Sequence, residues 1–248
     1  ASFLRGFGPP AVAARRNRCL HQELPDLDAP SINVLALPVG YELDGYRIER
    51  VLGAGGFGIT YLAVETLLGR RVAIKEFLPT GIATRGTDGQ SVRPITGDNH
   101  EMYRWGIDRF RQEAQTLVKF AHPNVVAIER YFEANGTAYL VMQYIEGKSL
   151  GTVLRELETI EAHEVLELLL PLLDGLAHVH EAGFLHRDIK PDNIFISTDG
   201  RPILIDFGAA RQALGQQSKS LTAIVSEGYA PYEQYEAHGN QGPWTDIY

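Results

Sequence analysis

Residues 186–193 read HRDIKPDN, and an Asp-Phe-Gly triplet begins at Asp206, 13 residues beyond Asn193. This region supplies a candidate base, Asp188, a lysine, Lys190, and two oxygen ligands suited to a hard cation, Asn193 and Asp206. Each residue alone could be an ordinary turn or surface residue. Together, at this spacing, they are typical of phosphoryl-transfer chemistry.

Two further motifs precede this region. Residues 53–58 read GAGGFG, and residues 72–75 read VAIK and end at Lys75. Glycines let backbone N–H groups approach phosphates without a clash from Cβ. A lone G-x-G-x-x-G also marks dinucleotide-binding folds and plain hairpins, but here ITYL follows, which is poor helix-start chemistry. No Gly-Lys-Ser/Thr is present at the loop, so the P-loop interpretation is excluded.

In this order, the motifs resemble those of the eukaryotic-type protein kinase family, and the Ile-Lys-Pro after Asp188 resembles its serine/threonine branch, with bacterial members as the best likeness. The resemblance implies an α+β bilobal fold, with a small β-sheet lobe that carries one regulatory helix and an incomplete helical large lobe. We expect a linker or disordered segment at residues 1–40, the small lobe at 41–145 and part of the large lobe at 146–248.

The resemblance also assigns the catalytic roles. Asp188 would orient the acceptor hydroxyl and accept its proton, and Lys190 would neutralise the γ-phosphate of ATP. Asn193 and Asp206 would hold Mg²⁺. The implied reaction is transfer of the γ-phosphate of Mg·ATP to Ser/Thr hydroxyls of protein substrates.

Lys75 would contact the ATP phosphates and needs a carboxylate to hold its ammonium in place. Glu113 is the candidate, because it shares a helix face with the apolar residues Phe110 and Leu117. The separation of 38 positions between Lys75 and Glu113 is longer than the resemblance leads us to expect. We therefore predict an inserted loop within residues 79–105.

The resemblance places the nucleotide against the glycine-rich loop and the hinge between the lobes. Thr60 stands where the family has valine, and its hydroxyl needs a partner or a water. The residues expected to contact the nucleotide are Gly53, Ala54, Gly55, Gly56, Phe57, Gly58, Thr60, Ala73, Lys75, Met142, Gln143, Ile145 and Phe195.

Three hydroxyl residues are candidate autophosphorylation sites in the segment after Asp206, namely Ser218, Ser220 and Thr222, and Arg187 could bind such a phosphate. A Ser-rich loop with no switch is about equally well supported. By resemblance, His186 is structural and forms an apolar column with Leu117, Ile128 and Phe207.

The end of the chain departs from the family pattern. Asp246 would anchor the catalytic loop, and Glu233 would lack its usual arginine partner. We predict a fragment of a longer kinase, poorly stable and inactive when expressed alone, whose missing helices would leave apolar surface on the helix at residues 163–180.

Hydrophobic periodicity and turn signals predict the local elements. We expect folded structure from about Tyr46, and a hairpin turn at Asn135-Gly136. Strands are expected at 46–52, 59–64, 71–75, 125–132, 137–142, 194–196 and 203–205, and helices at 107–120 and 163–180, the second distorted by Pro171.

The composition of the chain excludes several kinds of partner and site. A net charge of −8 argues against a protein that holds nucleic acid by neutralising phosphates. Cys19 is the only cysteine, which excludes an intrachain disulfide and a thiolate metal cluster. No apolar run reaches the length of a membrane span, and we expect a cytoplasmic domain, with membrane attachment possible through sequence beyond Tyr248.

Three other functions compete with the protein kinase. A non-catalytic nucleotide-binding scaffold is disfavoured, because such proteins usually lack one of the four residues Lys75, Asp188, Asn193 and Asp206. A small-molecule kinase is disfavoured because its catalytic loop usually lacks the equivalents of Arg187 and Lys190. A binding protein with no nucleotide is the weakest alternative.

Overall fold

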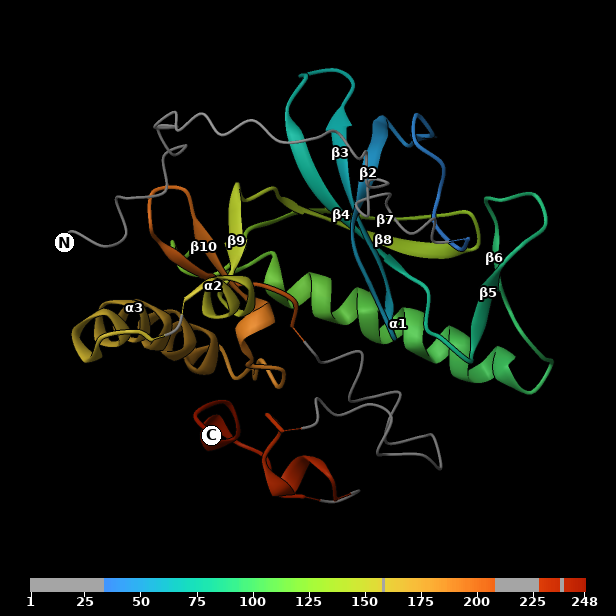
Figure 1. The fold of residues 1–248 in the computed structure, drawn as a ribbon. Helices are drawn as coiled ribbons and strands as arrows, with labels where there is room; N and C mark the ends of the chain where they lie inside the picture. The colour runs from blue at the N-terminus through green and yellow to red at the C-terminus, as the bar shows by residue number, and fades with distance from the viewer. Residues whose placement is uncertain (1–33, 158, 208–227, 237–238) are drawn as a thin grey trace, which may run out of the picture.

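The structure is a computed structural model that describes residues 34–157, 159–207, 228–236 and 239–248 (Figure 1). Two lobes follow one another along the chain, the first built mainly of strands and the second mainly of helices. The predicted phosphorylation sites Ser218, Ser220 and Thr222 lie outside the described residues, as does most of the predicted linker.

A six-stranded antiparallel sheet forms the small lobe, in the order β1-β2-β3-β4-β8-β7. Residues alternate between its two faces, and most residues of the central strand β4 are buried. The strands are β1 (Glu42–Leu43), β2 (Tyr46–Gly55), β3 (Gly58–Glu65), β4 (Arg71–Phe77), β7 (Ile128–Ala134) and β8 (Thr137–Gln143).

The hairpin between β7 and β8 turns at Asn135 and Gly136, as predicted. Both residues have positive φ angles, +53° and +74°, which is the backbone twist that a two-residue hairpin turn requires. Strand β7 begins at Ile128, three residues later than the predicted start. Val125 and Val126 instead contact β11 (Pro202–Leu204) of the large lobe through a bridge to Leu204. Apolar periodicity alone does not distinguish such a bridge from a strand.

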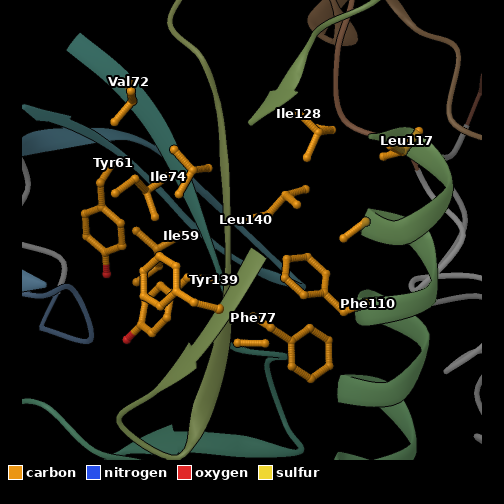
Figure 2. Packing of buried hydrophobic residues seen from close by; sticks show 14 of the residues in the cluster. Ile59, Tyr61, Val72, Ile74, Phe77, Phe110, Leu117, Ile128, Tyr139 and Leu140 are labelled. Atoms are coloured by element: carbon orange, nitrogen blue, oxygen red, sulfur yellow. The ribbon is translucent and has the colours of Figure 1, made fainter. Parts of the chain in front are cut away.

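Helix α1 (Asn99–Leu117) packs along one face of the sheet (Figure 1). Figure 2 shows Phe110 projecting from the helix toward Phe77 of β4, and their ring centroids are 5.5 Å apart. The helix begins eight residues before the predicted range of 107–120, which is therefore wrong at its start. Tyr103, which stacks on Phe77 at 5.8 Å, fixes this first part by a tertiary contact that local periodicity does not reveal.

The segment predicted to contain an inserted loop, residues 79–105, has regular secondary structure. It forms the hairpin of β5 (Ala83–Arg85) and β6 (Val92–Pro94) and then the first turns of α1. The turn is closed by Asp88, whose Oδ1 accepts hydrogen bonds from the N–H groups of Gln90 and Ser91, both at 2.9 Å. The strands are only three residues long, too short to give a periodic signal.

Packing of the small lobe also begins before Tyr46, the predicted start. Leu37 is 3% exposed and its N–H donates to the Tyr61 hydroxyl at 3.1 Å. Residues 34–40 lie in turns and have no periodicity that would indicate this contact.

The described part of the large lobe contains a three-stranded sheet, two α-helices and short 3₁₀ segments. Pro171 lies inside α3, whose bounds agree with the prediction to within one residue. Leu166 and Leu170 of α3 are 56% and 62% exposed. The elements are β9 (Gly147–Ser149), α2 (Leu150–Glu156), α3 (Ala162–Glu181), η1 (Pro191–Asn193), β10 (Ile194–Ser197), β11 (Pro202–Leu204), η3 (Tyr232–Gln234) and η4 (Pro243–Asp246).

Candidate active site

A cavity of roughly 680 Å³ opens between the glycine-rich turn of β2–β3, strand β4, the segment after β8 and strand β10. All the residues predicted to contact a nucleotide line this cavity, as do Lys190, Asn193 and Asp206. Sequence reasoning missed several apolar lining residues, including Leu52, Val126 and Ile205. Leu52 directly precedes the glycine-rich motif, and Ile205 directly precedes the Asp-Phe-Gly motif. Their position next to a motif could therefore have indicated that they line the cavity.

The glycine-rich turn leaves space toward the cavity. A Cβ placed on Gly53, Gly55 or Gly56 would meet no atom within 4 Å, whereas one on Gly58 would lie 1.8 Å from the Glu76 carbonyl oxygen. Gly58 is thus required for the close approach of β3 to β4. The other glycines leave open backbone that a phosphate group could approach.

Strand β4 places Lys75 at the cavity by simple alternation. Ala73 and Lys75 line the cavity, while Ile74 and Glu76 are fully buried on the other face of the sheet. The Lys75 ammonium forms an ion pair with the Asp206 carboxylate. Glu113 is 4% exposed on α1, and its predicted pairing with Lys75 stays a prediction.

Asp188 belongs to a tight cluster at the edge of this cavity. Its Oδ2 accepts a hydrogen bond from Asn193 Nδ2 at 2.6 Å and lies 3.2 Å from Lys190 Nζ. Asn193 Nδ2 also donates to the Asp188 carbonyl at 2.8 Å. With its amide hydrogens on Asp188, Asn193 presents its amide oxygen as the atom able to coordinate a metal.

Asp188 itself lines a smaller neighbouring pocket, together with Tyr229, Pro231 and Tyr248. Asn193 therefore connects the two spaces, because it lines the larger one and bonds to a residue of the smaller.

Asp246 anchors the catalytic loop, as the sequence predicted. Its Oδ2 and Oδ1 accept hydrogen bonds from the N–H groups of His186, at 2.8 Å, and Arg187, at 2.6 Å. His180 Nε2 lies 2.8 Å from the same carboxylate. Arg187 has a φ of +66°, a strained conformation that these contacts hold in place.

His186 has the structural role expected of it. The ring is fully buried against Phe207, with centroids 4.4 Å apart. Burial lowers the pKa of His186, so the ring is neutral at physiological pH. The tautomer with its proton on Nε2 satisfies both hydrogen bonds of the ring. Nε2 then donates to the Ile205 carbonyl at 3.0 Å, and Nδ1 accepts from the Asp188 N–H at 3.3 Å. Leu117 and Ile128, the other members of the predicted column, are buried too.

The Arg187 guanidinium is partly buried near two carboxylates, Asp246 of η4 and Glu113 of α1. Burial lowers the pKa of the Arg187 guanidinium, and the Asp246 and Glu113 carboxylates oppose that shift. Among the residues that the structure describes, the buried Arg187 Nε has no hydrogen-bond partner. Glu233, expected to lack an arginine partner, accepts a hydrogen bond from the Thr245 hydroxyl at 2.8 Å.

Comparison with known proteins identifies the family. Residues 46–248 match the model of the protein kinase domain. The chain belongs to the protein kinase family. It is 34% identical over 214 residues to the serine/threonine-protein kinase PknA of Nostoc, covering 82% of this chain and 35% of that protein. It is 37% identical over 180 residues to the probable serine/threonine-protein kinase pknA2 of Bifidobacterium longum, covering 73% of this chain and 22% of that protein.

Among solved structures, the apo form of PpkA-294 is similar to this kinase chain at 39% identity and a TM-score of 0.79, with 86% of this chain and 75% of that chain covered. The chain is thus a bacterial-type member of the serine/threonine branch, with the α+β kinase fold that the motifs predicted. It spans less than half the length of the curated relatives named above, 35% of the first and 22% of the second.

The described residues contain neither a membrane-spanning helix nor a clustered metal site. None of their helices combines the length and the apolar composition that crossing a bilayer requires. Within the same residues, no group of three or more His, Cys, Asp or Glu side chains could bind a metal. A site of one carboxylate and one amide fits Mg²⁺ held jointly with phosphate oxygens, because Mg²⁺ takes few protein ligands in such sites.

Proposed function

We propose that this chain transfers the γ-phosphate of Mg·ATP to serine or threonine hydroxyls of protein substrates. The observation that supports this proposal best is that Lys75, Asn193 and Asp206 line one cavity and that Asn193 bonds directly to Asp188. A cation, two oxygen ligands and a base are the groups that phosphoryl transfer needs.

Each residue has a role that its position supports. The glycine-rich turn and Lys75 would hold the phosphates, and the hinge residues Met142, Gln143 and Ile145 would hold the adenine. Asn193 and Asp206 would hold Mg²⁺, which supplies charge neutralisation to the phosphate oxygens. The ion pair between Lys75 and Asp206 keeps the lysine ammonium next to the proposed metal ligand in the cavity.

Asp188 would orient the substrate hydroxyl and receive its proton at Oδ1 or Oδ2. Lys190, 3.2 Å from Asp188 Oδ2, is close enough to balance the charge that develops near the transferred group. Position matters more than basicity here, since the acceptor oxygen must be in line with the bond that breaks.

The direct test measures Mg·ATP-dependent phosphorylation of a generic protein acceptor by the full-length protein and its Asp188→Asn variant. The variant should bind ATP with unchanged affinity and lose at least about 100-fold of its turnover. Asp199→Asn, in the exposed turn between β10 and β11, is the matched control and should keep its turnover. An Asp188→Asn protein that phosphorylates as fast as wild type would rule out this mechanism. Absent transfer by wild type with intact ATP binding would favour a nucleotide-binding scaffold.

We also propose that phosphorylation of Ser218, Ser220 or Thr222 regulates this site through Arg187. Support comes from the buried Arg187 Nε, which has no hydrogen-bond partner among the described residues. A bidentate bond to phosphate would satisfy such a guanidinium. Phosphatase treatment should lower the activity of wild type and leave an Arg187→Gln variant unchanged. Equal activity of treated and untreated wild type would overturn the proposal.

A further inference from the structure

The β5–β6 hairpin lies beside the sheet near the N-terminal end of α1 (Figure 1). Its Arg85 side chain is only 3% exposed, which is unusual because guanidinium groups are rarely buried unless they are paired. Neither the motifs nor the proposed reaction gives this residue a role.

Arg85 is held from several directions. Its two terminal nitrogens bind the two carboxylate oxygens of Glu76, at 2.8 Å and 2.5 Å. Its Nε donates to the Leu35 carbonyl, and one terminal nitrogen also donates to the Gln90 carbonyl, both at 2.8 Å. Burial lowers the pKa of Arg85, but the Glu76 carboxylate outweighs this effect and raises the Arg85 pKa overall, so Arg85 stays charged.

Glu76 is fully buried and directly follows Lys75 in β4. It also accepts hydrogen bonds from the hydroxyls of Tyr61, at 2.7 Å, and Tyr139, at 2.8 Å. Tyr61 is on β3 and Tyr139 is on β8, the two strands that flank β4. The donors to Glu76 therefore fix β4 against both neighbouring strands and the hairpin, at the position next to Lys75.

The same segment connects to α1. Asn99, the first residue of the helix, donates from Nδ2 to the carbonyls of Gly81 and Ile82, at 3.3 Å and 3.4 Å. Phe77, the residue after Glu76, stacks on Tyr103 of α1. The chain between β4 and α1 is thus bonded at both ends, to the strand of Lys75 and to the helix of Glu113.

A buried ion pair seldom adds net stability compared with well-packed apolar residues, because desolvation offsets the attraction. Its bidentate geometry does restrict how the bonded segments can be placed. We propose that Arg85 and Glu76 are positioning residues that hold Lys75 at a fixed place relative to α1, and that ATP binding and phosphoryl transfer depend on this pair. The proposal rests on the function proposed above.

The test compares wild type with Arg85→Lys and with the double variant Glu76→Gln/Arg85→Gln, all in the full-length protein. Lysine keeps the charge but cannot make the bidentate bond. The double variant removes the ion pair without leaving a lone buried charge. Arg70→Gln is the matched control, because Arg70 also joins two small-lobe segments, through Glu65 and Glu129, but is 51% exposed and far from the hairpin in sequence.

Thermal melts first define a temperature at which every variant is folded. At that temperature, we measure the dissociation constant of Mg·ATP by competition with a fluorescent nucleotide, and kcat and KM for a serine peptide. The double variant should bind Mg·ATP about 10-fold more weakly and lose at least about 10-fold in kcat, because a small displacement of Lys75 from its position is enough to cause losses of this size. Its peptide KM should stay within about 2-fold, Arg85→Lys should recover part of both losses, and Arg70→Gln should match wild type.

A double variant that melts at a lower temperature but keeps wild-type ATP affinity and kcat would overturn the proposal, because the pair would then act on stability alone. If the double variant does not fold, Arg85→Lys decides by the same two measurements. If wild type itself transfers no phosphate, the proposed function fails, and the ATP affinities still decide whether the pair positions Lys75.

Discussion

Replacing Asp246 by asparagine should weaken both the fold and the catalytic loop. The Asp246 side chain is fully buried and its two oxygens accept from the N–H groups of His186 and Arg187. Asparagine offers one carbonyl oxygen, so its NH₂ group would face one of these donors. One buried N–H left unpaired costs about 1–3 kcal/mol, and loss of charge assistance in the remaining bond costs about 1 kcal/mol more. We therefore expect a loss of about 2–4 kcal/mol in the free energy of unfolding.

The same change should release the strained Arg187 backbone and displace Asp188, which follows it. A displacement of about 1 Å can cost about 100-fold in turnover, so kcat should fall by that order while ATP affinity holds. The assay is denaturant unfolding of the full-length protein, with steady-state kinetics on the same samples. Asp174→Asn is the matched control, since Asp174 also contacts a histidine, His122 at 3.1 Å, but is 78% exposed. A loss below about 1 kcal/mol for Asp246→Asn, with unchanged kcat, would refute this reasoning.

Two further predictions concern packing and pH. Gly58→Ala places a methyl carbon 1.8 Å from the Glu76 carbonyl oxygen, so it should cost at least about 1–3 kcal/mol in the free energy of unfolding. Gly56→Ala, whose methyl meets no atom within 4 Å, should cost less than about 1 kcal/mol, and equal losses for both in denaturant unfolding would contradict the geometry. The lowered pKa of His186 means that the unfolded state binds the extra proton first, so stability should fall as pH drops below the unfolded value of about 6.5. His186→Phe should remove up to about 1.4 kcal/mol per pH unit of that slope, and an unchanged slope in urea titrations would show that His186 does not cause it.

The motifs predicted the cavity well because its residues are set by short-range sequence. Alternation along β4 was enough to place Ala73 and Lys75 on one face, and the Asn135-Gly136 signal was enough to place a hairpin. Cavity-lining positions such as Met142 and Phe195 came from the family resemblance, which carries spatial information that periodicity lacks.

The errors arose where contacts between distant residues decide the structure. The first turns of α1 depend on the stacking of Tyr103 on Phe77, and nothing local indicates that contact. Arg85 and Glu76 pair across nine positions and an intervening turn, in a segment with no recognisable motif. A buried ion pair produces no hydrophobic pattern in the sequence. The only sign of the insertion was therefore the long separation between Lys75 and Glu113.

The most direct test of the account is a crystal structure of the protein with Mg²⁺ and a non-hydrolysable ATP analogue. The account predicts the phosphates beneath the 53–58 turn within hydrogen-bond distance of Lys75 Nζ. It also predicts Mg²⁺ bound by Asp206 and the Asn193 amide oxygen, with Asp188 facing the γ-phosphate from the adjoining pocket. A nucleotide bound elsewhere, or Lys75 and Asp206 directed away from the phosphates, would contradict it.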